Sequence, residues 1–445
     1  MMTKRGGPGW GVVAVLLGTL TVPLDSAVNL DFPFITAHFG LPIPAIRWIV
    51  ISYTLTSASL LLVFGRIADM LGHRRVFLFG TLWSAGAFVA CGLAPSYAAL
   101  LGGRIAQGIG AGLVMSCGPA LITALYPEQS RARALGLYTL GFGLGGALGP
   151  LLGGVLATRF GWSAVFWARA PLAALGALAS LALPAPPRAT MRESFDAAGA
   201  ALLIAATACF VLLLDRLDRP IEAGAATILA LAAFLALLRR ERRAAHPIIA
   251  LGPFRDPGFA WANLAGVLVN LAGFAVLLLV PFALARLPAL PRAAWGALLA
   301  LSPAGIMAAG PLGGWLAARV APATIMSAGG LICALGLAGV AAAPGAIGPL
   351  AVAMTIQGVG LGLFQVAYLD VLAGAIPRRE RGVAGSLGML TRTLGIVTGA
   401  SLLIRLFQGL GGTDRFAAGF HGAVLFAAAL AAAAGVVSAL LRPRS

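Results

Sequence analysis

The sequence predicts an all-α, polytopic membrane protein that crosses the bilayer about fourteen times. Of its 445 residues, 60% are hydrophobic and 10% are charged, whereas a soluble domain carries about 25% charged residues. The apolar residues gather in runs close to the roughly 20 residues that a spanning helix needs. The runs lie near residues 10–33, 45–64, 76–94, 98–124, 134–157, 162–183, 198–215, 223–238, 258–285, 293–318, 323–343, 346–373, 383–407 and 418–441.

The charged residues lie in short clusters between these runs. The formal net charge of +17 would suit nucleic-acid binding if the arginines shared one soluble domain, but they are spread along the chain. An even number of spans places both ends of the chain on one side, and the segments on that side hold about 20 of the 31 Lys and Arg residues. We therefore expect both termini in the cytoplasm and the lipid bilayer, not nucleic acid, as the partner.

Cysteine and histidine form no metal-site pattern. The four cysteines fall inside apolar runs without C-x-x-C spacing, so they are expected to be small buried side chains. The four histidines are isolated near the ends of runs. The glycine-rich stretches are explained by close helix packing and do not indicate a nucleotide site. With no nucleophile–base cluster either, the sequence predicts no enzyme, catalytic residue, metal or cofactor.

The chain also repeats itself. Ala106–Leu113 recurs as Ile356–Leu363, 250 residues later, and Ser130–Gly136 recurs loosely as Glu380–Ser386 in the same register. A fainter echo of the segment 65–75 lies at 314–319. Glycine-rich packing could produce one such match, but three in nearly one register indicate duplication of a six-span unit.

Six spans occupy about 185 residues, so the repeat distance leaves about 65 residues for an insert. We predict an N-terminal six-helix bundle at 1–185, an inserted two-helix segment at 186–250 and a C-terminal six-helix bundle at 251–445. Two pseudo-symmetric halves are typical of alternating-access transporters, whose binding site lies between the halves near mid-membrane.

A dense polar segment, Gly65–Arg75, separates two long apolar runs. Its glycines allow a tight turn, and its arginines indicate the cytoplasmic side. The segment resembles the loop signature of the major facilitator superfamily, G-x-L-x-D-x-x-G-R-[KR]-[RK], with Ile67 for the Leu and His73 for the first Arg. This resemblance implies the major facilitator fold. The matching positions are Gly65, Asp69, Gly72, Arg74 and Arg75.

We expect this segment to be a conformational gate as well as a turn. Its echo at 314–319 lacks the acid and the basic pair, an asymmetry that a mere turn would not need. Asp69 would hold the inner side shut by meeting Arg131 and Arg133, or the positive N-terminus of a second-half helix.

Asp25 is the first candidate for proton handling, because ionisable residues inside spans are costly. Asp25, Asn29 and Pro33 are spaced i, i+4, i+8, which places them on one face of a continuous helix. They resemble the first-helix motif of fourteen-helix drug:proton antiporters, L-D-x-T-[VI]-[VI]-N-[VI]-A-x-P. A partly desolvated carboxylate there could take and release a proton. Alternatively, an arginine holds it permanently charged.

Asp31 stands where that motif usually has an alanine. We expect a solvated acid at the outer rim. If it faces the cavity instead, it adds a second negative charge for cationic substrates.

Arg104 and Gln107 match the superfamily's fourth-helix R-x-x-Q-G motif. An arginine inside a span needs a carboxylate or backbone carbonyls as partners. The resemblance implies a part in proton transfer beside Asp25, with a structural clamp as the alternative. Arg169 stands where the antiporters' sixth helix usually has an asparagine. It either faces the cavity, where it would disfavour cationic drugs, or reaches toward the outer surface.

The strongest functional pattern is glycine-rich. It reproduces G-x-x-x-G-P-x-x-G-G, which the superfamily carries in the fifth helix of antiporters. Small residues every four positions let two helix backbones approach closely, and the proline bends the helix. The resemblance implies antiport. The residues of the pattern are Gly145, Gly149, Pro150, Gly153 and Gly154.

The substrate surface is poorly marked. Aromatic, methionine and amide side chains suit an adaptable cavity, although each is also ordinary helix packing. The candidate cavity residues are Asn29, Asp31, Tyr53, Gln107, Met115, Phe142, Phe364, Gln365, Tyr368, Met389 and Arg392.

These patterns together predict a monomeric, proton-coupled antiporter of the cytoplasmic (inner) membrane, which exports drugs or other amphipathic small molecules. The proton gradient drives it without a cofactor. The alternatives are a transporter of the same fold for one physiological metabolite, and a membrane sensor that has lost transport.

Overall fold

The computed structural model describes residues 8–127, 131–183, 196–216, 219–244, 252–287, 290–317, 319–343, 345–375 and 381–440. Within these ranges every regular element is a helix. The longer helices are α1 (Pro8–Leu20), α4 (Ile46–Leu71), α5 (His73–Gly92), α6 (Tyr97–Ala124), α7 (Arg131–Phe160), α9 (Arg169–Ser180), α10 (Ala197–Arg216), α11 (Pro220–Arg243), α12 (Pro257–Leu284), α13 (Arg292–Ala317), α14 (Pro322–Ala342), α15 (Ile347–Ala375), α16 (Arg381–Gly409) and α17 (Phe416–Ala439). The short ones are η1 (Pro23–Asp25), α2 (Ser26–Leu30), α3 (Phe32–Phe39), η2 (Ile43–Ala45), α8 (Ala164–Trp167) and η4 (Gly252–Arg255).

The prediction of a polytopic all-α membrane protein is confirmed. In the described ranges, eleven helices are long and apolar enough to cross a membrane, or up to twelve with the bent pair Phe32–Phe39 and Ile43–Leu61. Two shorter apolar helices, Ala164–Ser180 and Ala198–Leu214, lie at the predicted sixth and seventh runs. Helical structure therefore occurs at each predicted run.

The first span is broken, which corrects the expectation of one continuous helix over 10–33. α1 ends at Leu20, the short 3₁₀ turn η1 follows, and α2 carries the chain only to Leu30. Pro23 at the start of η1 has no N–H to donate and its ring crowds the preceding turn, which favours an interruption of the α-helix at this point. The break places Asp25 at the junction of η1 and α2.

The turn in the segment 65–75 is tighter than expected. α4 continues to Leu71 and α5 begins at His73, so Gly72 alone joins them. Its φ of 95° is a conformation that glycine adopts easily. Gly65, expected in the turn, lies instead within α4.

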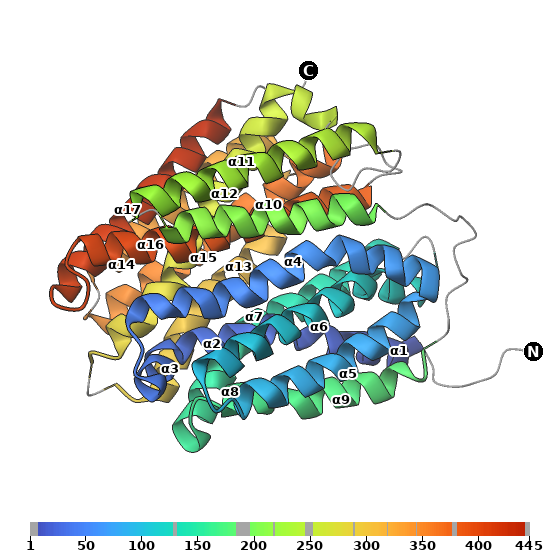
Figure 1. The fold of residues 1–445 in the computed structure, drawn as a ribbon, viewed down its shortest axis with the longest axis horizontal. Helices are drawn as coiled ribbons and strands as arrows, with labels where there is room; N and C mark the ends of the chain where they lie inside the picture. Colours follow the sequence, from blue (N-terminus) through green and yellow to red (C-terminus); the bar gives the residue numbers. More distant parts are fainter. Residues whose placement is uncertain are drawn as a thin grey trace, which may run out of the picture.

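The bundle has two sides that meet along two seams. Figure 1 shows the blue and teal helices α1–α9 on one side and the yellow to red helices α12–α17 on the other. α7 packs along α13, and α4 packs along α16. These two contacts join the first side of the bundle to the second.

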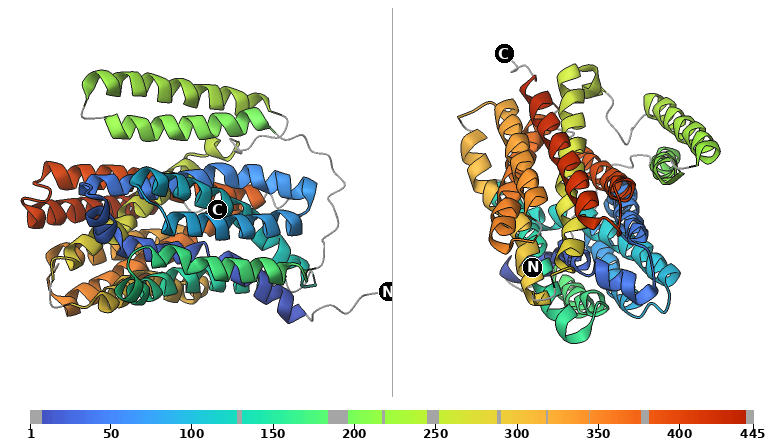
Figure 2. Two further views of the ribbon diagram at one scale, coloured as in Figure 1. Left: turned by 60° about the horizontal axis from the view of Figure 1, so that its bottom comes forward. Right: turned by 90° about the vertical axis from the view of Figure 1, so that its left-hand side faces the viewer.

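Helices α10 and α11 pack on each other and lie on one flank of the bundle (Figure 2). Arg240 near the end of α11 donates from Nε to Asp196 Oδ1 at 2.9 Å, and the backbone N–H of Gly199 donates to the same oxygen at 3.0 Å. The start of α10 is thus tied to the end of α11. The division into 1–185, 186–250 and 251–445 stays a prediction; residues 186–195 and 245–250, and the last residues of both termini, lie outside the described ranges.

Candidate functional site

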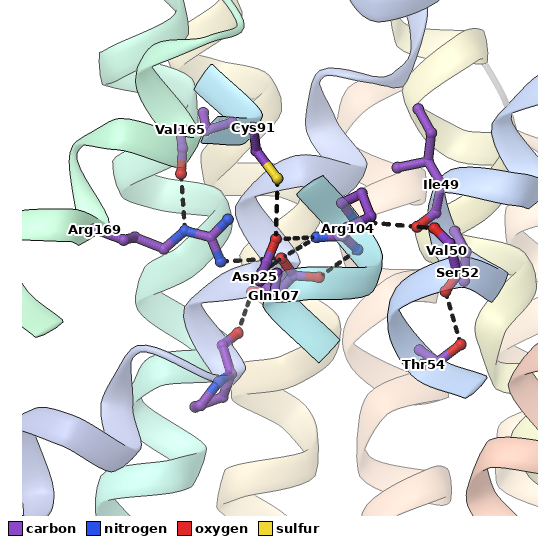
Figure 3. Close-up of polar contacts among 12 residues, drawn as sticks. Asp25, Ile49, Val50, Ser52, Thr54, Cys91, Arg104, Gln107, Val165 and Arg169 are labelled. Atoms are coloured by element: carbon purple, nitrogen blue, oxygen red, sulfur yellow. Dashed lines mark hydrogen bonds and ion pairs between the residues drawn. The ribbon is translucent and has the colours of Figure 1, made fainter. Parts of the chain in front are cut away.

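Asp25 is the centre of a buried polar cluster (Figure 3). Arg104 binds it with two parallel hydrogen bonds, Nη1 to Oδ1 at 2.6 Å and Nη2 to Oδ2 at 2.9 Å. Arg169 donates from Nη1 to Oδ1 at 2.9 Å, and Gln107 donates from Nε2 to the same oxygen at 2.7 Å. In Figure 3 the two arginines approach the carboxylate from opposite sides. One acid thus accepts from helices α6 and α9.

Arg104 is held by its own surroundings. Its Nε donates to the backbone carbonyl of Ile49 in α4 at 3.0 Å, and its Nη1 also donates to Gln107 Oε1 at 2.9 Å. Its guanidinium carbon lies 4.4 Å from the ring centroid of Tyr53. We expected Arg104 to have a carboxylate or backbone carbonyls as partners, and it has both, Asp25 and the carbonyl of Ile49.

Arg169 faces the interior and not the outer surface. Its side chain is 5% exposed, its Nε donates to the carbonyl of Val165 at 2.9 Å, and it stacks 4.5 Å from the ring centroid of Phe88. The alternative in which Arg169 reaches toward the outer surface is wrong. Since two guanidinium groups share one carboxylate, this cluster carries an excess positive charge.

The remaining first-helix candidates differ from expectation. Asp31 is fully buried, so it is not a solvated acid at the outer rim. The short helices α2 and α3 meet at Asp31, so Asp25, Asn29 and Pro33 do not share the face of one continuous helix. The break at Pro23 and the joint at Asp31 remove the regular helical spacing on which that expectation depended.

The antiporter glycines pack α7 against the broken span. A Cβ at Gly145 would lie 2.5 Å from Pro23, one at Gly149 would lie 2.1 Å from Ser26 Oγ, and one at Gly153 would lie 3.0 Å from Ala27. Ser26 also donates from Oγ to the carbonyl of Gly146 at 3.0 Å. The glycines therefore allow the backbone beside Asp25 to rest directly on α7.

The same helix meets the second half on another face. A Cβ at Gly296 of α13 would lie 2.3 Å from the carbonyl oxygen of Pro150 and 3.2 Å from Gly154. The glycine pattern thus connects the Asp25 region on one side with the α7–α13 seam on the other.

The predicted gate is only partly described. Arg74 donates from Nε to the carbonyl of Ser180 at 3.2 Å and from Nη2 to the carbonyl of Leu181, so it caps the end of α9. Asp69 pairs with His73 of its own segment at 3.4 Å, and Arg75 is exposed. The side chains of Arg131 and Arg133, the expected partners of Asp69, lie outside the described part of the chain.

A second polar cluster lies in the other half, and the sequence reasoning found only part of it. Tyr368 donates its hydroxyl to Asn263 Oδ1 at 3.0 Å, and Thr391 donates to the same oxygen at 3.3 Å. Gln365 donates to Asn270 Oδ1 at 3.4 Å. Gln365 and Tyr368 were candidates, whereas Asn263, Asn270 and Thr391 were missed. Two asparagines seven residues apart in one apolar run were the available signal.

The other candidate cavity residues are less informative. Phe364 is fully buried and stacks on Tyr368, with ring centroids 6.2 Å apart. Met115 and Phe142 pack against the apolar core of the first half, and Met389 is half-buried. Arg392 is exposed, although its helix neighbours Thr391 and Thr393 are buried.

Comparisons with known proteins agree with this architecture. Riboflavin transporter RibZ of Clostridioides difficile (strain 630) is 27% identical over 401 residues, which cover 89% of this chain and 87% of that protein. Multidrug resistance protein Stp of Mycobacterium tuberculosis (strain CDC 1551 / Oshkosh) is 30% identical over 403 residues, which cover 88% of this chain and 74% of that protein.

Among solved structures, a bacterial homolog of the human lysosomal transporter Spinster, inward-facing and unoccupied, superposes with a TM-score of 0.74. The match covers 99% of this chain and 98% of that chain at 16% identity, which shows a common fold. The family model for the Major Facilitator Superfamily matches residues 15–400. The chain belongs to the Major Facilitator Superfamily, and it is a membrane transporter and not an enzyme.

Proposed function

We propose that this transporter is a proton-coupled antiporter that exports drugs or other amphipathic small molecules across the cytoplasmic membrane by alternating access. Both termini are on the cytoplasmic side in this proposal, the working unit is a monomer, and the proton gradient is the driving force. Similarity to a protein named for multidrug resistance supports export of such molecules. The glycine pattern of α7, which resembles that of antiporters, supports the exchange mode.

One observation carries the proposal: the half-buried carboxylate of Asp25 binds two buried arginines at a break in the first span. Protonating Asp25 would remove the negative charge that contacts Arg104 and Arg169. Buried guanidinium groups left without a counter-charge are strongly unfavourable, so proton uptake has to be accompanied by movement of these helices apart. The chain is already broken at η1, and the glycines of α7 that pack against η1 and α2 carry no side chains. The Asp25 segment can therefore move without unfolding a continuous helix.

In the proposed cycle, Asp25 takes up a proton when the site opens outward, and substrate leaves. When the site opens inward, Asp25 loses the proton, reforms its bonds with both arginines, and substrate binds. In this cycle the protonation state of Asp25 determines whether substrate is bound or released, which couples transport to the proton gradient.

Everted vesicles that contain a pH-sensitive dye test this proposal. Adding a transported substrate to energised vesicles should release part of the proton gradient. Asp25→Asn should reduce this release to background while substrate exchange without a gradient continues, because the amide keeps the shape of the carboxylate but does not take up or release a proton. Asp414→Asn, which alters an exposed acid before α17, is the matched control and should behave as wild type.

If Asp25→Asn retained full proton release, Asp25 would not be the coupling residue. If no member of a broad substrate panel disturbed the gradient, the antiport proposal itself would be contradicted.

The second candidate is a transporter for one physiological metabolite. The relative named as a riboflavin transporter favours it, because that similarity covers most of both chains. A substrate panel in a pump-deficient bacterial host separates the two functions. Resistance to several unrelated compounds supports drug export, whereas accumulation or loss of one metabolite alone supports the second candidate.

A further inference from the structure

The charges around Tyr53 bear on the kind of molecule that this transporter carries, if the proposed export function holds. Asp25 binds Arg104 and Arg169 at 2.6 and 2.9 Å, and the Arg104 guanidinium lies 4.4 Å from the ring centroid of Tyr53 in α4. A third guanidinium group, Arg392, is carried by α16, which packs along α4. The formal charges of Asp25 and these three arginines sum to +2. An excess of positive charge inside a membrane protein is costly unless an anion compensates it.

Arg392 differs from the other two arginines in this group. Arg104 and Arg169 are buried and bind Asp25, whereas the Arg392 side chain is exposed at a position well inside α16. Among the described residues, it makes neither a hydrogen bond nor an ion pair. Its guanidinium can therefore bind a molecule that lies beside the middle of α16, the helix that packs along α4.

The side chains nearest to Arg392 along α16 and across on α4 are neutral polar and aromatic groups. Thr391 joins the neutral cluster of Asn263 and Tyr368 through its bond to Asn263 Oδ1. On the opposite helix α4, Tyr53 presents an aromatic ring that already stacks on Arg104. The site thus combines one available positive group with neutral amide, hydroxyl and aromatic groups.

We propose that the exported molecule is an amphipathic anion, such as a carboxylate or phenolate, whose negative group binds Arg392 beside Tyr53. A cation would meet three guanidinium groups opposed by one carboxylate that is already occupied. An anion, in contrast, offsets the excess charge and gains charge-assisted hydrogen bonds from Arg392.

Fluorescein and rhodamine 123 provide a direct test, because both contain a xanthene ring system but carry opposite charge. Energised everted vesicles should accumulate fluorescein and should not accumulate rhodamine 123. Arg392→Gln should lower the initial rate of fluorescein uptake by about 10-fold. Arg392→Lys, which keeps the charge, should restore part of the rate.

Arg415→Gln is the matched control, because it removes one exposed arginine before α17 that is not part of the site. It should leave fluorescein uptake unchanged. The amount and monodispersity of each variant after extraction from the vesicles distinguish loss of binding from loss of folding.

Uptake of rhodamine 123 without fluorescein would overturn the anion proposal and leave the export function standing. Equal fluorescein uptake by wild type and Arg392→Gln would likewise overturn the assignment of Arg392. If neither dye moved and no panel compound released protons, the proposed export function would fail, and the anion proposal with it.

Discussion

The two halves of the molecule share a polar contact but differ in charge. In the first half, Cys91 Sγ lies 3.9 Å from Gln107 Oε1; in the second, Gln357 Nε2 lies 4.0 Å from Cys333 Sγ. Gln107 and Gln357 occupy matching positions of the sequence repeat, and each lies close to a cysteine of its own half. Around these glutamines the two halves diverge.

In the first half the glutamine bonds Arg104 and Asp25, whereas Gln357 accepts a hydrogen bond from Ser302 at 2.6 Å. The residue related to Arg104 by the repeat is Met354, which is fully buried. Close packing recurs in both halves, but the buried ion pairs of Asp25 are in the first half.

Glycines also allow close helix packing at matching places in the two halves. Gly149 of α7 approaches Ser26 beside Asp25, and Gly399 of α16 approaches Leu271 beside Asn270. Asn270 is thus in a place comparable to Asp25, but its partner is the neutral Gln365. The second half offers neutral hydrogen-bonding groups, which suit substrate contacts better than proton transfer.

Converting Arg104 to its second-half counterpart should have the largest effect. Arg104→Met removes two bonds to Asp25 and the bond to Ile49, and leaves the carboxylate with one guanidinium partner, Arg169, and the neutral amide of Gln107. Breaking a buried ion pair costs about 3–5 kcal/mol, so we expect proton-driven efflux to fall by about 100-fold or more. Efflux kinetics in energised vesicles measure this. A loss of less than threefold would mean that the charge difference between the halves is not functional.

The glycine seams should show a smaller, graded difference. A Cβ at Gly149 would lie 3.1 Å from the Ala27 backbone nitrogen, so Gly149→Ala should displace α2 and cut efflux by about 10-fold. Gly146→Ala is the matched control in the same helix, because a Cβ there meets nothing within 4 Å.

Gly399→Ala is the companion variant in the second half, because its Cβ would lie 3.0 Å from the Leu271 carbonyl oxygen and its three nearest atoms all belong to Leu271. It should lower apparent thermal stability more than it lowers proton coupling. Equal loss of coupling in Gly149→Ala and Gly399→Ala would remove the functional distinction between the seams.

The smallest effect is expected in the neutral cluster. Tyr368→Phe deletes the hydroxyl that donates to Asn263, a loss of about 1 kcal/mol. Substrate affinity should weaken by a few-fold while the pH dependence of efflux stays unchanged. Tyr126→Phe, at the end of α6, is the control. A changed pH dependence in Tyr368→Phe would show that proton coupling extends into the second half.

The sequence predicted the helical runs, the family and the meeting of Asp25 with Arg104, because hydrophobic length and short motifs determine these features locally. It missed the break at Pro23 because an apolar run does not reveal where its helix stops. The position of Arg169 could not be deduced, since it depends on how α9 packs against α5. Asp31 was misplaced because spacing alone does not show that the helix is interrupted between α2 and α3 or that this position is buried.

The helix pair α10–α11 also limits how a molecule can reach the site from the lipid. α10 contacts both α4 and α16, the helices that carry Tyr53 and Arg392, and it lies on the outer flank of the bundle (Figure 2). It therefore screens the α4–α16 seam from acyl chains. A substrate dissolved in the bilayer would have to displace this pair to pass sideways between those helices, so shortening α10 should open a lateral path that the intact protein keeps closed.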